Sequence, residues 1–193
     1  MKKIAVLVSG GGTNLQAILD AQTAGVIKSG KVTCVVSSSK NAYALERAKN
    51  ADVPAVAMTR AEFGDGLCDA ICDYLISQEI DYIVLAGFLV ILKGKILKEF
   101  ENRIINIHPS LIPSFCGDGF YGLKVHEAAL SYGVKVTGAT VHFVNEITDG
   151  GKIIMQQAVE VREGDTPEVL QKRVMEEAEW KILPQAIEKV CSK

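Results

Sequence analysis

The 193-residue sequence lacks three features, and each absence argues against a class of protein. No apolar run approaches the roughly 20 residues that a membrane-spanning helix needs. Basic residues are not in excess, because 21 lysines and arginines against 23 aspartates and glutamates leave a net charge of −2, which argues against nucleic-acid binding. The apolar run Ile4–Val8 is too short for the core of a secretion signal. We therefore expect a cytoplasmic protein without membrane contact.

The five cysteines and three histidines lack the spacing of a cross-linked or metal-binding protein. The number of cysteines is odd and none form a Cys-x-x-Cys pair, so neither a disulfide framework nor a structural zinc site is expected. The histidines stand far apart and form no His-Glu-x-x-His pattern. We therefore expect no protein-bound metal.

Hydrophobic periodicity alternates between short β-rich runs and longer amphipathic stretches. Continuous apolar runs predict strands buried on both faces, and their alternation with helices predicts a doubly wound, mostly parallel, Rossmann-like α/β sheet. The predicted strands cover residues 3–8, 31–37, 54–58, 81–86 and 103–108. The predicted helices cover residues 14–24, 42–51, 67–78 and 94–100.

The pattern changes after the fifth predicted strand. Residues 109–121 contain two prolines and two glycines and predict a long loop, a kind of segment that is usually functional or disordered. A helix is predicted over 123–131. Two strands, 134–144 and 152–161, follow and predict a C-terminal antiparallel hairpin.

The last helical region is predicted to begin at Thr166, which caps it, with Pro167 in the first helical position. Pro184 is expected to break or kink this terminal helix. The chain length suits a single domain over residues 1–193.

A glycine-rich turn, Gly10–Gly12, separates the first strand from the first helix. Such a turn exposes backbone N–H groups and the positive end of the helix dipole, which suit a phosphate, and Thr13 and Asn14 add side-chain donors. The simpler alternative is a tight turn without a ligand. The turn is not a P-loop, because no Gly-Lys-Ser/Thr follows, and Leu15 at the third glycine position makes it a poor dinucleotide fingerprint.

Asn106 and His108 end the fifth predicted strand. Strand side chains alternate, so these two point to one face and Ile107 points to the other, while Pro109 releases the chain into the loop. Open α/β sheets bind ligands at this carboxyl edge. An amide can hydrogen-bond a developing oxyanion, and an imidazole can do the same or move a proton. The alternative is a capped strand end with a structural histidine.

Asp149 precedes Gly150 and Gly151 in a turn signature between the last two strands. One interpretation is a plain hairpin turn. The other is a carboxylate on a flexible loop beside His108, where it would favour the imidazolium and position a water.

Other candidates carry weaker signals. His142 shares a strand face with Thr140, which favours core packing. His126 stands beside Glu127 on a predicted helix and is interpreted as a surface or packing residue. The apolar segment Phe88–Leu92 is either core or the wall of a flat apolar ligand site.

Together these segments resemble the glycinamide ribonucleotide formyltransferase family over essentially the whole chain. The matching segments are Val8–Gln16, Leu85–Phe88, Asn106–Pro113, Thr140–Val144 and Asp149–Gly151. Folate-dependent formyltransferases and hydrolases share the motif Asn-x-His-Pro-Ser-Leu-x-Pro. The glycine-rich start and the short length are typical of the ribonucleotide enzyme.

The resemblance implies transfer of a formyl group from 10-formyltetrahydrofolate, the co-substrate, to the amine of N1-(5-phospho-D-ribosyl)glycinamide. The products would be the N2-formyl compound and tetrahydrofolate, in de novo purine (IMP) biosynthesis. It implies no metal, small-molecule partners only, and a monomer or weak homodimer. Residues 1–108 would form the phosphate-binding half, and residues 109–193 the folate-binding half with the catalytic loop.

The resemblance also implies roles for individual residues. The catalytic trio is Asn106, His108 and Asp149. The substrate phosphate is held by Gly12, Thr13 and Asn14. The folate pocket is lined, partly through backbone atoms, by Leu89, Val90, Ile91, Leu92 and Asn106. The ribonucleotide contact from the last helical region is Glu179.

The chain departs from the family pattern at four positions. Val90 and Gly64 stand where arginines that contact the folate tail are often found. Trp180 stands where histidine is common, and Glu176 stands where a basic residue can occur. These departures concern substrate contacts rather than the chemistry.

Other functions are compatible with the same motifs. A formyltransferase for methionyl-tRNA is expected to carry a further C-terminal domain and a basic surface, and the formyltetrahydrofolate hydrolase an N-terminal regulatory domain. A formyltransferase for a nucleotide sugar is a further relative. From other classes, a non-catalytic Rossmann-like nucleotide sensor or an NADP oxidoreductase would share the fold.

Overall fold

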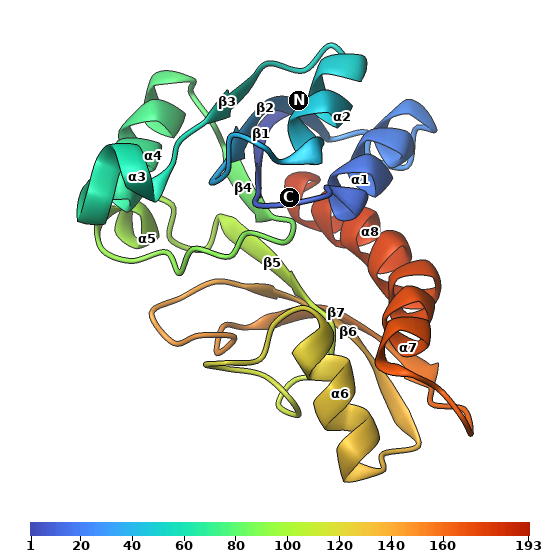
Figure 1. The fold of residues 1–193 in the computed structure, drawn as a ribbon. Coiled ribbons are helices and arrows are strands. Elements are labelled where there is room, and N and C mark those ends of the chain that lie inside the picture. Colours follow the sequence, from blue (N-terminus) through green and yellow to red (C-terminus); the bar gives the residue numbers. More distant parts are fainter.

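A seven-stranded sheet runs through the computed structural model, which describes all residues 1–193 (Figure 1). The strand order is β3-β2-β1-β4-β5-β6-β7. Strands β1 to β5 pair in parallel, whereas β5–β6 and β6–β7 pair antiparallel. The sheet confirms the predicted fold class, a mostly parallel Rossmann-like sheet with an antiparallel C-terminal hairpin.

Every predicted strand and helix is present, with bounds that differ by at most two residues. The strands are β1 (Lys2–Val8), β2 (Gly30–Ser37), β3 (Ala55–Ala57), β4 (Tyr82–Leu85), β5 (Ile104–His108), β6 (Val136–Phe143) and β7 (Ile153–Glu160). The helices are α1 (Thr13–Thr23), α2 (Tyr43–Asn50), α3 (Arg60–Phe63), α4 (Leu67–Ser77), α5 (Lys95–Glu99), α6 (Leu123–Tyr132), α7 (Pro167–Val174) and α8 (Trp180–Cys191). The sequence analysis missed the short helix α3 and the 3₁₀ turn Gly64–Gly66 that follows it.

The two faces of the central strand β1 contribute to two separate hydrophobic clusters. Ile4, Val6 and Val8 pack with α1, α2, α7 and α8 on one face, whereas Ala5 and Leu7 pack with α4 and α5 on the other. Figure 1 shows these two groups of helices on opposite sides of the sheet. The continuous apolar run therefore reflects burial on both faces. None of the helices combines the length and apolarity needed to cross a bilayer.

Three loops meet at the carboxyl edge of the parallel strands. The glycine-rich turn follows β1, residues 86–94 follow β4, and residues 109–122 follow β5. Because β1, β4 and β5 are neighbours in the sheet, their loops lie side by side. The chain runs from β1 through β2 to β3 and then returns to β4 on the other side of β1, so the strand order reverses at β1, the kind of position where open α/β sheets bind ligands.

The terminal helical region differs from the prediction. Thr166 caps α7 as expected, accepting a hydrogen bond from the Val169 N–H at 3.3 Å, and Pro167 opens the helix. Pro184 does not break the region, because it lies inside the continuous helix α8. Proline has no N–H, so the helix lacks the hydrogen bond that residue 184 would donate to the carbonyl of Trp180. The irregularity is instead the π turn Met175–Glu179, between α7 and α8.

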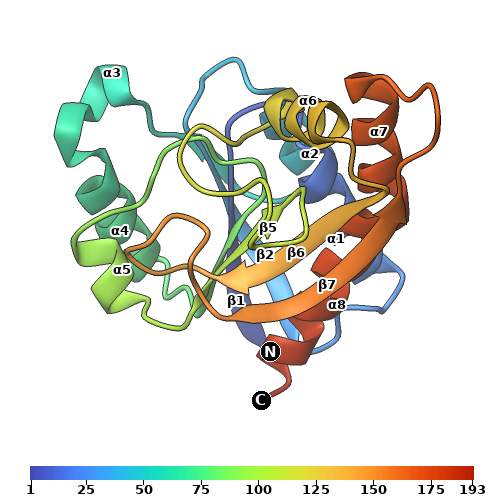
Figure 2. The ribbon, with the colours of Figure 1, turned by 90° about the horizontal axis from the view of Figure 1, so that it is seen from below.

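The antiparallel strands β6 and β7 form one margin of the sheet, with α7 and α8 packed along them (Figure 2). Their connection returns so tightly that a Cβ atom at Gly151 would overlap the carbonyl oxygen of Phe143. Asp149 lies in this connection. Gly151 is therefore needed for the local chain path that places Asp149.

We expect Gly151→Ala to lower the free energy of unfolding by about 1–3 kcal/mol, because the added methyl group forces the two backbone segments apart. Urea denaturation followed by circular dichroism measures the change. Gly66→Ala is the matched control, since no heavy atom lies within 4 Å of a Cβ there, and it should cost at most about 1 kcal/mol. Equal losses in the two variants would contradict the packing argument.

Candidate active site

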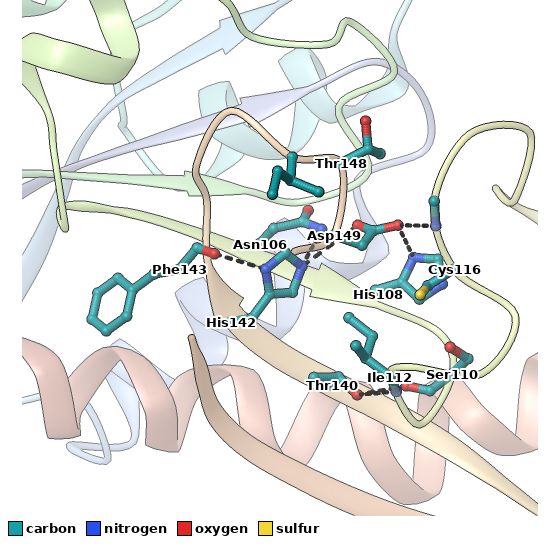
Figure 3. A network of polar contacts seen from close by, with 12 residues as sticks. Asn106, His108, Ser110, Ile112, Cys116, Thr140, His142, Phe143, Thr148 and Asp149 are labelled. Atoms are coloured by element: carbon teal, nitrogen blue, oxygen red, sulfur yellow. Dashed lines mark hydrogen bonds and ion pairs between the residues drawn. The ribbon is translucent and has the colours of Figure 1, made fainter. Parts of the chain in front are cut away.

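Two antiparallel strands present four polar side chains at the carboxyl edge of the sheet (Figure 3). On β5, Asn106 and His108 point to one face, as predicted, while Ile107 packs into the core on the other. On β6, His142 lies opposite Asn106, and Thr140 lies opposite His108. The strand pairing therefore places an amide and two imidazoles in one cluster.

The Asp149 carboxylate reaches this cluster from the β6–β7 connection. Its Oδ2 atom lies 3.5 Å from Nδ1 of His108, and its Oδ1 atom lies 3.5 Å from Nε2 of His142. The backbone N–H of Gly117 donates a 2.9 Å hydrogen bond to Oδ2. Asp149 adopts a left-handed backbone conformation (φ 54°). Of the two interpretations from the sequence, the structure agrees with a carboxylate beside His108.

The contacts of His108 favour the charged ring. Its Nε2–H donates to the carbonyl oxygen of Phe115 at 2.9 Å, which leaves Nδ1 facing the carboxylate. Both ring nitrogens can donate only when the ring is an imidazolium. Burial, together with the charge of His142, nevertheless lowers the pKa of His108 overall, although the Asp149 charge and the Phe115 carbonyl act in the opposite direction.

Asp149 stays a carboxylate at neutral pH. Burial by itself would raise the pKa of Asp149. Hydrogen bonds from the His142 ring and the Gly117 N–H, together with the charges of the two imidazoles, outweigh burial and lower that pKa. The site thus contains a fixed negative charge beside a histidine that can be protonated.

His142 is part of this polar network as well as of the core, where the sequence analysis placed it. The side chain is buried, but Nδ1–H donates to the Phe143 carbonyl at 2.8 Å and Nε2 lies 3.1 Å from the Asn106 amide nitrogen. The ring thus lies with Nε2 between the Asn106 amide and the Asp149 carboxylate and connects the two groups. The sequence signal was the shared face of Thr140 and His142, which becomes informative only once β6 is known to pair with β5.

His126 is also buried, so of the two interpretations, a surface or a packing residue, the structure agrees with packing. It is only 1% exposed, and neither ring nitrogen has a hydrogen-bond partner. Burial, followed by the charge of His108, lowers the pKa of His126 to about 4. The charged neighbour Glu127 was misleading, because consecutive helical residues point about 100° apart.

The loop at residues 109–121 closes over the cluster, and no helix or strand interrupts it. Thr140 Oγ1 donates to the Ser110 carbonyl at 2.7 Å, which anchors the start of the loop on β6. Near its other end, Asp118 accepts a 3.1 Å hydrogen bond from Thr148 beside Asp149. Cys116 is a free thiol in this loop, and burial, then the charge of Asp149, raises its pKa, so it is not an activated nucleophile.

The glycine-rich turn ends at Gly12, the N-cap of α1, in a left-handed conformation (φ 72°). A Cβ there would lie 2.6 Å from Cβ of Ala44, so glycine is required. No side chain caps the helix, which leaves first-turn N–H groups without a protein partner. Asn14 donates to Glu179 at 2.7 Å, and burial raises the pKa of that glutamate. The predicted phosphate residues and the predicted ribonucleotide residue therefore lie together.

The apolar segment after β4 lies beside this turn. Leu89 and Ile91 are 66% and 67% exposed, whereas Leu92 is buried in the core and can reach a ligand only through its backbone. The Ser9 hydroxyl accepts a 2.9 Å hydrogen bond from the Leu89 N–H. Ser9, which the sequence analysis did not single out, thus joins the end of β1 to this segment. The structure contains no group of three or more potential metal ligands.

Comparison with known proteins identifies relatives over nearly the whole chain. A family model described as formyl transferase matches residues 2–187. The phosphoribosylglycinamide formyltransferase of Haemophilus influenzae is 45% identical over 97% of this chain and 86% of its own length. The chloroplastic phosphoribosylglycinamide formyltransferase of Arabidopsis thaliana is 40% identical over 98% of this chain, which spans 65% of that longer protein. The structure of glycinamide ribonucleotide transformylase 1 from Symbiobacterium toebii superposes with a TM-score of 0.93 at 45% identity, covering 100% of this chain and 88% of that one.

The chain belongs to the formyl transferase family. Within that family, the relatives just described are phosphoribosylglycinamide formyltransferases.

We expect Asp149→Asn to lower the pKa of His108, because the variant removes the charge that opposes the effect of burial. Titration of the His108 ring protons by NMR measures the pKa, and asparagine tolerates the left-handed conformation of Asp149. Asp118→Asn removes a carboxylate from the facing loop that does not contact His108, so it should leave this pKa unchanged. An unchanged or higher pKa in Asp149→Asn would show that the carboxylate does not stabilise the imidazolium.

Proposed function

We propose that this enzyme transfers the formyl group of 10-formyltetrahydrofolate to the amine of glycinamide ribonucleotide, a step of purine biosynthesis. The observation that carries the proposal is the Asp149 carboxylate held between two imidazoles, with the Asn106 amide beside them. This arrangement supplies hydrogen-bond donors for an oxyanion and a negative charge that balances a protonated histidine.

The chemistry begins when the neutral amine attacks the formyl carbon and a new C–N bond forms. The electron pair of the carbonyl moves to oxygen, and Asn106 and protonated His108 stabilise that oxyanion. Asp149 keeps His108 charged and, through water, helps a proton move from the attacking nitrogen to the folate nitrogen. The bond to the folate nitrogen then breaks, which releases tetrahydrofolate and the formylated product. No covalent enzyme intermediate is required.

The loop around Phe115 has to shift before His108 can act through Nε2. In the structure, that N–H donates to the Phe115 carbonyl. The carbonyl oxygen thus takes the place where the substrate oxygen would accept this hydrogen bond. Phe115 has a left-handed backbone (φ 49°), a conformation that costs a residue other than glycine roughly 1–2 kcal/mol. Replacement of this carbonyl by the substrate oxyanion leaves His108 with an equivalent partner.

The two substrates are proposed to lie end to end along the carboxyl edge. The phosphate binds at Gly12, Thr13 and Asn14, where first-turn N–H groups are free, and Glu179 holds the ribonucleotide beside Asn14. The folate follows the segment after β4, where the exposed side chains of Leu89 and Ile91 suit a flat apolar ligand. This segment belongs to residues 1–108, so in this arrangement both halves of the chain contribute to the folate site.

The remaining parts of the proposal concern partners and location. Both substrates are small molecules, and the protein uses them in the cytoplasm as a monomer or weak homodimer. The reaction requires 10-formyltetrahydrofolate as co-substrate and no metal.

The direct test mixes the purified protein with glycinamide ribonucleotide and 10-formyltetrahydrofolate and follows tetrahydrofolate release by absorbance. We expect His108→Ala and Asp149→Asn to lower kcat by about 10²–10³, because each loses a donor or the charge that supports one. Glu127→Gln, an exposed change on α6, should retain wild-type turnover. Circular dichroism would show that all variants fold.

Each outcome of this assay discriminates between functions. Release that depends on the ribonucleotide supports the transferase. Release without the ribonucleotide indicates the hydrolase, and no release from folded protein indicates another acceptor or a non-catalytic role. Wild-type turnover in both site variants would contradict the catalytic assignment.

A further inference from the structure

Arg47, on α2, contacts the glycine-rich turn and has no role in the proposed function described above. Its Nε–H donates to the Gly11 carbonyl at 2.8 Å, and an Nη1–H donates to Oε1 of Gln16 at 3.0 Å. Its guanidinium also lies 5.1 Å from the centre of the Tyr43 ring. These contacts hold the cation in a single orientation beside the N-terminus of α1.

The charge of Arg47 has no anionic partner in the protein. Its hydrogen-bond acceptors are a carbonyl and an amide oxygen, both neutral. By contrast, Arg60, Arg162 and Arg173 each form an ion pair with a carboxylate. Arg47 therefore brings an uncompensated positive charge to a turn that already has free N–H groups.

Arg47 also lies close to the N-cap of α1, because its Cδ atom would be 3.4 Å from a Cβ atom at Gly12, and a cavity beside the guanidinium runs along α1. The cavity has a volume of about 440 Å³, and Thr13, Gln16, Arg47 and Trp180 are among the residues that line it. Thr13 is the first residue of α1, so the cavity begins at the first turn of that helix, beside the Arg47 guanidinium, and Asp20 lines its far part. Asp20 accepts a 2.8 Å hydrogen bond from Gln16, which fixes the amide that holds Arg47.

We propose that Arg47 is a positioning residue that holds the glycine-rich turn in its anion-binding shape and supplies a countercharge to the phosphate monoester of the substrate. The inference rests on the proposed function for the identity of the substrate, but phosphate binding itself can be measured without formyl transfer. The bond to Gly11 sets the path of the turn, and the free positive charge attracts the dianion.

These two contributions can be separated by substitution. Arg47→Gln can keep a hydrogen bond to Gly11 but loses the charge. Arg47→Lys keeps the charge but loses the planar fork that reaches Gly11 and Gln16 together. Lys49→Gln removes the same charge from an exposed position on the same helix and serves as the matched control.

The experiment measures binding of inorganic phosphate by calorimetry and the steady-state kinetics with both substrates. For Arg47→Gln we expect the Kd for phosphate and the KM for the ribonucleotide to rise on the order of five- to twenty-fold, as for the loss of a partly exposed charge near a dianion. Neither kcat nor the KM for folate should change more than about two-fold, because a uniform binding interaction affects only KM. Arg47→Lys should fall between Arg47→Gln and wild type, and Lys49→Gln should match wild type.

A charge effect also depends on salt. The difference between wild type and Arg47→Gln should shrink as ionic strength rises toward about 1 M, where the Debye length is near 3 Å. A purely structural disturbance of the turn would persist at high salt and would lower kcat as well.

The outcomes distinguish this inference from the proposed function. Wild-type protein that binds phosphate through Arg47 but transfers no formyl group would refute the function and retain the phosphate site. Wild-type protein that binds no phosphate, or a folded Arg47→Gln variant that binds it as tightly as wild type, would overturn the inference. If Arg47→Gln does not fold, the Arg47→Lys variant tests the inference instead. An unchanged Kd for phosphate and KM for the ribonucleotide in that variant would show that the planar guanidinium has no positioning role.

Discussion

The Asp149 carboxylate is the group on which the arrangement of this site depends. A negative charge with little solvent access needs several donors, and here they come from different parts of the chain: the Gly117 N–H and the rings of His108 and His142. Through these contacts, Asp149 joins the β6–β7 connection to the loop after β5 and to strands β5 and β6. The charge of one side chain therefore determines how two loops pack together.

The topology of the sheet brings this cluster and the glycine-rich turn to the same edge. All parallel strands end on one side, so the loops after β1, β4 and β5 are neighbours although up to a hundred residues separate them. Single hydrogen bonds then refine the arrangement. Ser9 connects the turn to the segment at Leu89, and Asn14 connects it to Glu179.

Much of the fold could be predicted from sequence because its signals are local. The double-sided burial of β1, the glycine at the N-cap of α1 and the cap at Thr166 each depend on a few consecutive residues. The prediction was wrong or left open where the outcome depends on distant parts of the chain. Pro184 lies inside the continuous helix α8, and His126 is buried because its helix face packs inward even though Glu127 beside it is exposed.

The sequence by itself determined the order of strands and helices, the shared face of Asn106 and His108, and the resemblance that named Asp149 as their partner. Only the tertiary structure decided three contacts. His142 joins the cluster beside Asn106, the Phe115 carbonyl accepts the hydrogen bond from Nε2 of His108, and Arg47 donates to the glycine-rich turn. The physical reason is the range of the interactions. Side-chain periodicity and capping act over a few residues, whereas antiparallel pairing, loop closure and the meeting of α2 with the N-terminus of α1 depend on contacts between segments that are distant in the chain.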